Sequence, residues 1–336
     1  MKKVILLLAA VAAVVVCSCK EVKPKESCER YAMTLTDIVC DDMETSFPGE
    51  MYMSGQYFVW TDPFNKDAFV HIVDTKTGKE VGTMVQKGEG PEEFVSPHVD
   101  VMTGNRLFAY DLFANRGAVL SIDSCIAGGN PVVRKQPIEL KDFTSLVFLD
   151  EDLLVAFIPA ANEPFVMVEQ KQSFGKLPFD GNINNVYDHF QGIVKYNPYN
   201  EYLYYSTFKI PYTALYKRDD QGFSLEKEEL RTNDYSIENN DLKYTGNVRG
   251  PMGVTLTADY IVSIDTDPQA EPIDYFKIGL DYTKLPTTIC LYDYSLQLRK
   301  VINVGMPVVR ITSSPQNNVL FVLGVSPDFT LYRVEL

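Results

Sequence analysis

The sequence predicts an all-β fold, a six-bladed β-propeller with four-stranded antiparallel blades. Three observations support this prediction. One β-rich unit recurs six times, and long amphipathic helical patterns are missing. The apolar runs are short and rich in Tyr, Phe, Val and Ile, a composition that favours strands over helices. The N-terminal part of the chain also contains a segment that can complete the last unit and close the ring.

The repeated unit consists of a short apolar strand, a brief polar loop and a second strand that often ends in charged residues. The first strands of the six copies begin at Gln56, Arg106, Asp152, Glu201, Asp259 and Asn318. Their second strands begin at Ala68, Gly117, Pro164, Tyr212, Thr287 and Phe329. Successive copies start 50, 46, 49, 58 and 59 residues apart. Such spacing is typical of propeller blades with some long insertions.

Further strands flank these pairs. Candidate innermost strands precede the pairs and begin at Val99, Thr144, Gly192 and Val308. More polar segments follow the pairs and begin at Lys79, Val132 and Leu296. Because the outer strand of a blade has one edge toward solvent, it tolerates polar residues. Each unit therefore predicts a four-stranded blade.

The last copy ends at Leu336 after its third strand, which would leave an open sheet edge prone to aggregation. The segment CERYAMTLTDIV, which begins at Cys28, has alternating apolar residues at Tyr31, Met33 and Leu35. We expect it to close the ring as the outer strand of the last blade. A seventh blade would need another copy of the unit, and the sequence contains none.

The N-terminus has the features of a secretory signal. Lys2 and Lys3 precede an apolar run from Val4 to Val16, which is too short to span a bilayer. The run ends in Val-Cys-Ser-Cys, which resembles the bacterial lipobox. Cys19 fits as the acylated residue because the residue before it, Ser18, is small. The alternative is an ordinary signal peptide cleaved near Ser18.

The expected organisation is a signal peptide over 1–18, a flexible tether over 19–27 and a propeller domain over 28–336. The mature chain is then extracytoplasmic and bound to the outer membrane through acylated Cys19, on the periplasmic or the cell-surface face. It has 29 basic and 45 acidic residues, a net charge of −16. That balance argues against nucleic acid or an anionic membrane surface as a partner, because both attract clustered Lys and Arg.

Two neighbouring segments carry a resemblance to a known family. Residues 87–94 read KGEGPEEF, and residues 107–123 read LFAYDLFANRGAVLSID. Together they resemble a loop and a turn of six-bladed TolB-like propeller lipoproteins of Gram-negative bacteria. The match is close over about residues 80–123, residues 247–251 are a partial echo of the loop, and the remainder matches in blade rhythm. The resemblance implies a binding or scaffold role and supplies no catalytic residues.

The loop also has a physical interpretation. Gly88 and Gly90 allow positive φ, and Pro91 fixes φ, so the chain can turn tightly between two blades. Four cysteines, Cys28, Cys40, Cys125 and Cys290, remain beside Cys19. They allow three complete pairings, none of which follows from the sequence.

No catalytic motif emerges from the sequence. His71 lies in a β run, whereas His98 and His189 precede innermost strands and could face the mouth of a central channel. Either could bind a metal or act as a base. However, the chain contains no H-E-x-x-H, His-x-His or G-x-S-x-G pattern and no calcium loop. We therefore predict no metal, no cofactor and no defined catalytic residue.

Ligand sites favour loops displayed by a rigid scaffold. In a propeller, the loops between second and third strands share one face with the connections between blades. The candidate ligand-binding residues on that face are Lys87, Glu89, Glu93, Asp111, Arg116, His189, Arg249 and Tyr275. The expected function is non-catalytic binding of a glycan, peptide or protein. The alternative is a hydrolase or lyase with its site in the central funnel.

Overall fold

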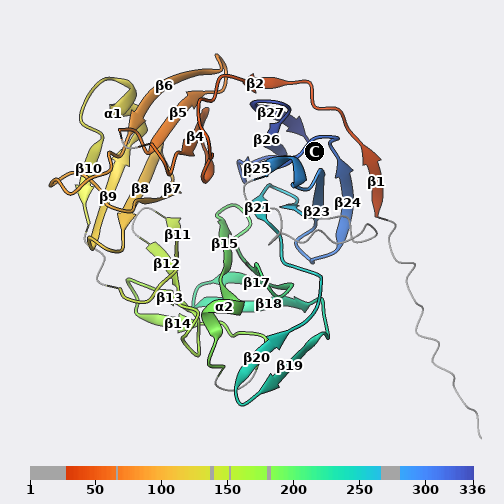
Figure 1. The fold of residues 1–336 in the computed structure, drawn as a ribbon. Coiled ribbons are helices and arrows are strands. Elements are labelled where there is room, and N and C mark those ends of the chain that lie inside the picture. The colour runs from red at the N-terminus through yellow and green to blue at the C-terminus, as the bar shows by residue number, and fades with distance from the viewer. Residues whose placement is uncertain (1–27, 66, 137–139, 151–152, 180–182, 266–280) are drawn as a thin grey trace, which may run out of the picture.

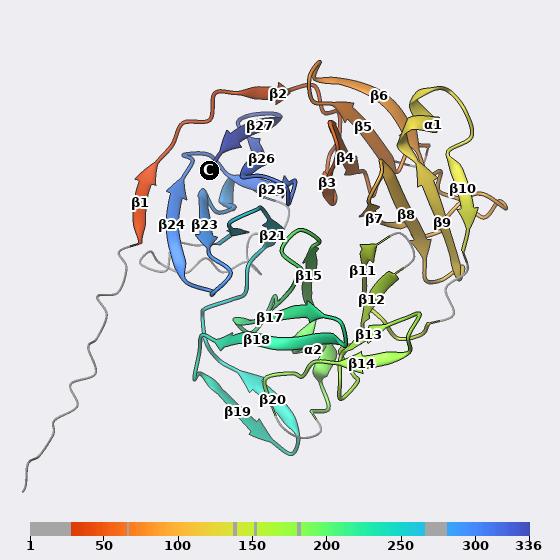
Figure 2. The same ribbon diagram turned by 180° about the vertical axis from the view of Figure 1, so that it is seen from behind.

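The computed structural model describes residues 28–65, 67–136, 140–150, 153–179, 183–265 and 281–336. They form six four-stranded antiparallel blades around a central axis (Figures 1 and 2). The predicted six-bladed β-propeller is therefore confirmed.

The bounds of the strands follow the predicted rhythm. Blade 1 contains β3 (Met51–Ser54), β4 (Tyr57–Thr61), β5 (Val70–Asp74) and β6 (Lys79–Met84). Blade 2 contains β7 (His98–Met102), β8 (Arg106–Asp111), β9 (Arg116–Ser121) and β10 (Val132–Lys135). Blade 3 contains β11 (Ser145–Asp150), β12 (Leu153–Phe157), β13 (Phe165–Met167) and β14 (Gln172–Phe174).

The second half of the ring repeats this order. Blade 4 contains β15 (Gly192–Asn197), β16 (Tyr202–Thr207), β17 (Tyr212–Asp219) and β18 (Gly222–Leu230). Blade 5 contains β21 (Gly253–Leu256), β22 (Ile261–Ile264), β23 (Thr288–Tyr292) and β24 (Leu298–Asn303). Blade 6 contains β25 (Val308–Ser313), β26 (Val319–Val325), β27 (Phe329–Glu335) and, from the N-terminal segment, β2 (Ile38–Cys40).

The N-terminal segment closes the ring, as predicted, but as two strands rather than one. β2 pairs antiparallel with β27, with Cys40 opposite Leu331. The preceding strand β1 (Glu29–Ala32) pairs parallel with β24, with Tyr31 opposite Ile302. Both views show β1 at the outer edge of blade 5 (Figures 1 and 2). Between the two strands, Leu35 packs into the apolar cluster between blades 5 and 6, so the chain passes from one blade to the next.

Each blade is buried on both of its faces. Six apolar clusters occupy the six interfaces between neighbouring blades. Strand β8 illustrates how the sequence produces them. Leu107 and Ala109 pack toward blade 1, whereas Phe108 and Tyr110 pack toward blade 3. Side chains alternate across a strand, so two buried faces require a continuous apolar run.

Three further elements interrupt the regular pattern. Helix α1 (Ile122–Ile126) begins after Ser121, whose hydroxyl accepts a hydrogen bond from Ser124 N. Helix α2 (Val186–Phe190) precedes β15, and the hairpin of β19 (Tyr235–Glu238) and β20 (Asp241–Tyr244) is inserted between blades 4 and 5. Leu242 of the hairpin packs against Phe190 of α2. Within the described ranges, no helix has the length and apolar character needed to cross a bilayer.

Candidate functional site

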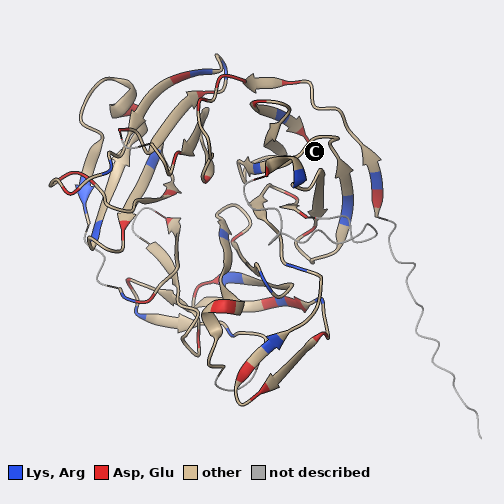
Figure 3. Cartoon of the chain, viewed as in Figure 1, with Lys and Arg blue, Asp and Glu red and all other residues tan. Residues whose placement is uncertain are grey.

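Strand direction places two kinds of connection on the same side of the ring. These are the loops between the second and third strands of a blade, and the segments that join one blade to the next. We call this side the loop face. It comprises the described residues within 41–50, 62–69, 85–97, 112–115, 136–144, 158–164, 175–191, 208–211, 231–252, 265–287, 304–307 and 326–328. Acidic and basic residues are interspersed around the ring (Figure 3).

Asp111 holds the corner between blades 1 and 2. Its fully buried carboxylate accepts hydrogen bonds from Val95 N at 2.6 Å and Ser96 N at 2.9 Å. It also accepts from Phe113 N at 2.9 Å and Ala114 N at 3.0 Å. Burial alone would raise the pKa of Asp111, but the four N–H groups together lower it below its ordinary value. The carboxylate is therefore charged and fully engaged by backbone.

Arg116 fixes the other side of the same corner. Its guanidinium donates to Gly90 O at 2.6 Å and to Glu93 O at 2.8 Å. The Glu93 carboxylate in turn accepts from Gly90 N at 2.8 Å. Lys87 donates to a neighbouring backbone carbonyl, Pro63 O, at 2.5 Å, whereas Glu89 is exposed. The structure thus brings these four predicted site residues and Asp111 together, and all except Glu89 hydrogen-bond to backbone.

The glycines of this loop serve a different purpose from the one predicted. Neither Gly88 nor Gly90 has a positive φ, and nearby it is Val85 that adopts a φ of 66°. A side chain at Gly88 would collide with the Glu93 carboxylate, and a Cβ at Gly90 would lie 2.9 Å from Glu93 Cδ. The interpretation from positive φ is wrong. The glycines leave room for the acidic side chain that closes the loop.

His189 and Arg249 belong to another part of the loop face, near blade 4. His189 is 3% exposed, and its Nε2 lies 3.0 Å from the side-chain nitrogen of Asn185. Burial and the nearby Lys209 ammonium lower the pKa of His189, so its imidazole is neutral. Arg249 lies over the ring of Tyr244 and donates to Lys209 O at 3.4 Å. Tyr275 lies outside the described residues.

Exposed apolar side chains gather on the loop face, and the sequence analysis did not single them out. The eight described residues of this kind on this face are Phe64, Val95, Leu112, Phe113, Tyr187, Phe208, Ile237 and Val248. Phe113 is 84% exposed and Phe64 68%. In the part of the chain that the structure describes, the large apolar side chain exposed in the loops of the opposite face is Tyr199.

The two most exposed phenylalanines are displayed by the same kind of turn. Asp62 accepts hydrogen bonds from Phe64 N at 3.0 Å and Asn65 N at 3.2 Å. Asp111 makes the equivalent bonds to the N–H groups of Phe113 and the residue after it. A carboxylate that binds the backbone two and three residues ahead forces the chain to turn outward. The signal in the sequence was therefore an Asp followed two residues later by Phe, in equivalent loops of two blades.

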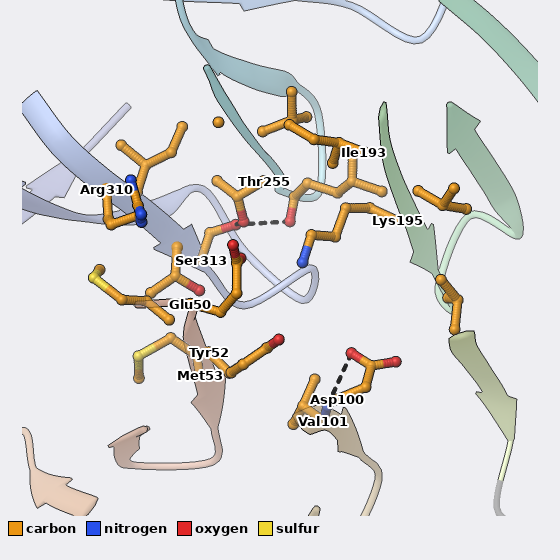
Figure 4. A pocket seen from close by; sticks show the side chains of 18 of the residues that line it. Glu50, Tyr52, Met53, Asp100, Val101, Ile193, Lys195, Thr255, Arg310 and Ser313 are labelled. Carbon is orange, nitrogen blue, oxygen red and sulfur yellow. Dashed lines mark hydrogen bonds between the residues drawn. The ribbon is translucent and has the colours of Figure 1, made fainter. Parts of the chain in front are cut away.

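A second candidate site is the central channel. All six innermost strands line a cavity of about 350 Å³. Four charged side chains from different blades line it, namely Glu50, Asp100, Lys195 and Arg310 (Figure 4). Glu50 immediately precedes β3 and so lies at the loop-face end of the channel. The other three lie within the innermost strands β7, β15 and β25.

Asp100 is the acidic residue of the channel whose pKa is raised. Burial raises its pKa to about 6, and the negative charge of Glu50 adds to the increase. The Lys195 ammonium and the N–H groups of Val101 and Phe148, at 3.0 and 3.3 Å, act in the opposite direction. The carboxyl group therefore titrates near neutral pH, which is a feature of functional sites as well as of structural ones.

The two cations of the channel are held differently. Lys195 Nζ lies 5.1 Å from the centre of the Tyr52 ring. The Tyr52 hydroxyl donates to a backbone oxygen, Val99 O, at 2.5 Å. Arg310 donates through Nε to Gly49 O at 3.1 Å and through Nη1 to Val309 O at 3.0 Å. Main-chain groups thus orient Arg310, whereas an aromatic face supports Lys195.

These charged groups do not form a connected catalytic set in the described part of the chain, where no hydrogen bond or ion pair joins any two of Glu50, Asp100, Lys195 and Arg310. The same ranges contain no cluster of three or more His, Cys, Asp or Glu side chains suited to a metal ion. No disulfide joins Cys28, Cys40, Cys125 and Cys290. The described residues therefore show no contact that would support a hydrolase or lyase site in the central channel.

Comparisons with known proteins do not identify a family. No family model matches the chain, and no curated protein matches it. The resemblance to TolB-like propeller lipoproteins therefore remains a prediction.

Among solved structures, 856 chains match. The β-propeller domain of Cps50 (Swd1) from Myceliophteria thermophila has 10% identity and a TM-score of 0.47, with 85% of this chain and 82% of that one covered. Hydrazine synthase of Kuenenia stuttgartiensis has 13% identity and a TM-score of 0.48, with 87% and 97% covered. A chain of a mitotic checkpoint complex has 11% identity and a TM-score of 0.46, with 100% and 99% covered. Likenesses this distant carry no functional argument.

Replacing Asp111 by Asn should destabilise the propeller. The amide offers one oxygen, and its NH₂ group would face backbone N–H groups that need an acceptor. We expect a loss of about 2–4 kcal/mol in the free energy of unfolding at neutral pH, measured by urea denaturation. Asp241→Asn, on the exposed hairpin, is the matched control and should change stability by less than about 0.5 kcal/mol. Equal effects of the two substitutions would contradict the role of Asp111.

Replacing Asp100 by Asn should change how stability depends on pH. The folded state binds the Asp100 proton more tightly than the unfolded state, because the folded pKa is about 6 and the ordinary value is 3.8. This contribution to stability is fully present below about pH 4 and is lost as the pH rises through about 6. The wild type should therefore lose up to about 3 kcal/mol relative to Asp100→Asn between pH 4 and pH 7.5. Urea denaturation of both proteins at both pH values measures this loss. A difference in stability between the two proteins that stays the same at pH 4 and pH 7.5 would refute the prediction.

Proposed function

We propose that this protein is an envelope-anchored, non-catalytic binding module whose loop face holds a protein partner. The single observation that carries the proposal is the concentration of exposed apolar side chains on that face. Eight large apolar residues among those that the structure describes are exposed there, and Phe113 is 84% exposed. Several large apolar side chains exposed on one face of a domain favour an interaction site there, because leaving them in water costs free energy.

The chemistry of this surface favours a protein over a glycan. The exposed side chains include Val95, Leu112 and Val248, which have no aromatic face for stacking on a sugar. Phenylalanine also lacks a polar group that could bind a sugar hydroxyl. By contrast, aromatic and aliphatic anchors surrounded by charged residues are typical of protein interfaces. Glu89 is exposed in the same corner and can belong to such a polar rim.

The rigidity of the turns that carry the exposed phenylalanines also favours a protein partner. Phe64 and Phe113 lie on short turns whose backbone N–H groups are bound by Asp62 and by buried Asp111. Arg116 ties the neighbouring loop to the same corner. An anchor that is already ordered loses less conformational entropy when it is buried by a partner.

Anchoring at the cell envelope rests on the sequence. The apolar N-terminal run and the Val-Cys-Ser-Cys segment favour acylation of Cys19. β1, which the tether precedes in sequence, lies at the outer edge of blade 5 (Figure 1). Attachment at the perimeter would leave the loop face accessible.

Site-specific crosslinking in the native cells tests the proposed interface. A photoreactive phenylalanine analogue at position 113 should give a discrete protein adduct, whereas the same analogue in place of Tyr199 on the opposite face should not. A second substitution, Phe64→Asp, should reduce the adduct at position 113 at least about tenfold if both side chains anchor the partner. Adducts of equal yield at both positions, or none at position 113, would count against the loop face.

Acylation is tested by Cys19→Ala. Without the thiol the chain cannot receive the acyl groups, so the protein should move from the membrane fraction to the soluble envelope fraction and lose labelling by a radioactive fatty acid. Cys17→Ala is the matched control and should leave both properties unchanged. Retention of the label in Cys19→Ala would show that the lipobox interpretation is wrong.

A further inference from the structure

We infer that the central channel is a second binding site, for a small zwitterionic molecule that carries both an ammonium and a carboxylate group. The inference does not rest on the proposed protein-binding function, but the channel opens onto the loop face, where Glu50 and Phe208 belong to both. It rests on the juxtaposition of unlike charges from four blades around one cavity (Figure 4).

The size of the channel suits a small molecule. Its volume of about 350 Å³ lies near the lower end of the range of about 300–1,000 Å³ for small-molecule sites. Its wall is rigid, because the six strands that line it also form the interfaces between blades. Apolar side chains, including Met53 and Val101, also line the channel (Figure 4). Rigid, mostly apolar walls with a few polar groups are typical of ligand sites.

The carboxylates provide the side of the site that would bind an ammonium group. Glu50 accepts no hydrogen bond through its carboxylate within the described part of the chain. Asp100 accepts from Val101 N and Phe148 N, which leaves further lone pairs on its two oxygens. The charges of both residues are close enough to influence each other, since Glu50 raises the pKa of Asp100. An ammonium group placed between them would relieve this repulsion.

Lys195 provides the complementary side. Its ammonium has three N–H donors, and it donates no hydrogen bond to the residues that the structure describes. The Tyr52 ring supports the charge from one side, and Figure 4 shows the side chain extending into the space that Glu50 and Asp100 also face. Arg310 is committed to two backbone carbonyls through Nε and Nη1, so Lys195 is the main group for a ligand carboxylate.

Charge balance selects a zwitterion over a simple ion. The channel contains two acidic and two basic side chains, and of the two acids Asp100 is desolvated whereas Glu50 is exposed. A simple anion at Lys195 would lie near Glu50 and Asp100, and a simple amine would lie near Lys195. A ligand with both groups pairs with each side, which offsets the cost of removing these charges from water.

Titration calorimetry on the purified mature domain tests the inference, with L-alanine, L-leucine and glycylglycine as probes. At least one probe should bind. Its N-acetyl derivative, which lacks the ammonium, and its C-terminal amide, which lacks the carboxylate, should each bind at least about tenfold more weakly. No binding by any of the three probes, or equal binding by a blocked derivative, would overturn the inference.

Variants locate the binding site. Lys195→Met and Glu50→Gln should each weaken the bound probe at least about tenfold, and thermal unfolding confirms that they fold. Lys217→Met is the matched control, because Lys217 also lies over a tyrosine ring, 4.9 Å from the centre of Tyr202, yet does not line the channel. Unchanged affinity in both channel variants, or an equal loss in Lys217→Met, would contradict the assignment. Phe64→Asp, the variant that tests the loop-face proposal, should bind the probe with unchanged affinity. A failure of the loop-face proposal can therefore be distinguished from a failure of the channel proposal.

Discussion

The pairing of β2 with β27 is the constraint on which the rest of the molecule depends. Every blade is apolar on both faces, so each needs a neighbour on either side. The cluster between blades 6 and 1 contains Phe58 and Trp60 from one side and Leu323 and Leu331 from the other. β2 brings the beginning of the chain to the end of it, where Cys40 joins the same cluster. The central channel is a consequence, because its wall exists only when all six innermost strands face one another.

The hydrogen bonds of one corner determine both its stability and the exposure of a loop side chain. Asp111 binds backbone on both sides of one corner, and Arg116 ties the preceding loop to it. The same hydrogen bonds that hold the corner direct Phe113 away from the core. The stability of the corner and the exposure of Phe113 therefore depend on the same few contacts. A substitution that alters the display also loosens the junction between blades 1 and 2, so the two properties are physically coupled.

Much of the fold could be predicted because strand rhythm is a local property. The apolar runs at Arg106 and Glu201 coincide with the second strands of their blades, β8 and β16. The closing strand was also predictable, since an open edge needs a partner. Its division into β1 and β2 was not, because Leu35 turns inward only when blades 5 and 6 are already adjacent. The hairpin of β19 and β20 lacks the long apolar runs of the blades and gave no comparable signal.

The candidate sites were less predictable for the same physical reason. Asp100, Lys195 and Arg310 all lie in segments predicted as innermost strands. Their common cavity depends on residues roughly one hundred positions apart in sequence, and a strand period does not say which residue faces the axis. The loop around Gly88 and Gly90 was placed correctly between two blades. The requirement for glycine comes from the nearby Glu93 carboxylate, a contact that only the three-dimensional packing reveals.

The inserted hairpin also removes the rotational symmetry of the ring. Leu242 fixes it against Phe190 and Ile210 beside blade 4, so one sector of the rim has an extension that the regular blade pattern lacks. Figure 1 shows it projecting beyond the circle of blades. Without the hairpin, a partner could bind the six similar blades in several rotated orientations. A molecule that contacts both the hairpin and the corner at Phe113 can bind the propeller in one orientation only.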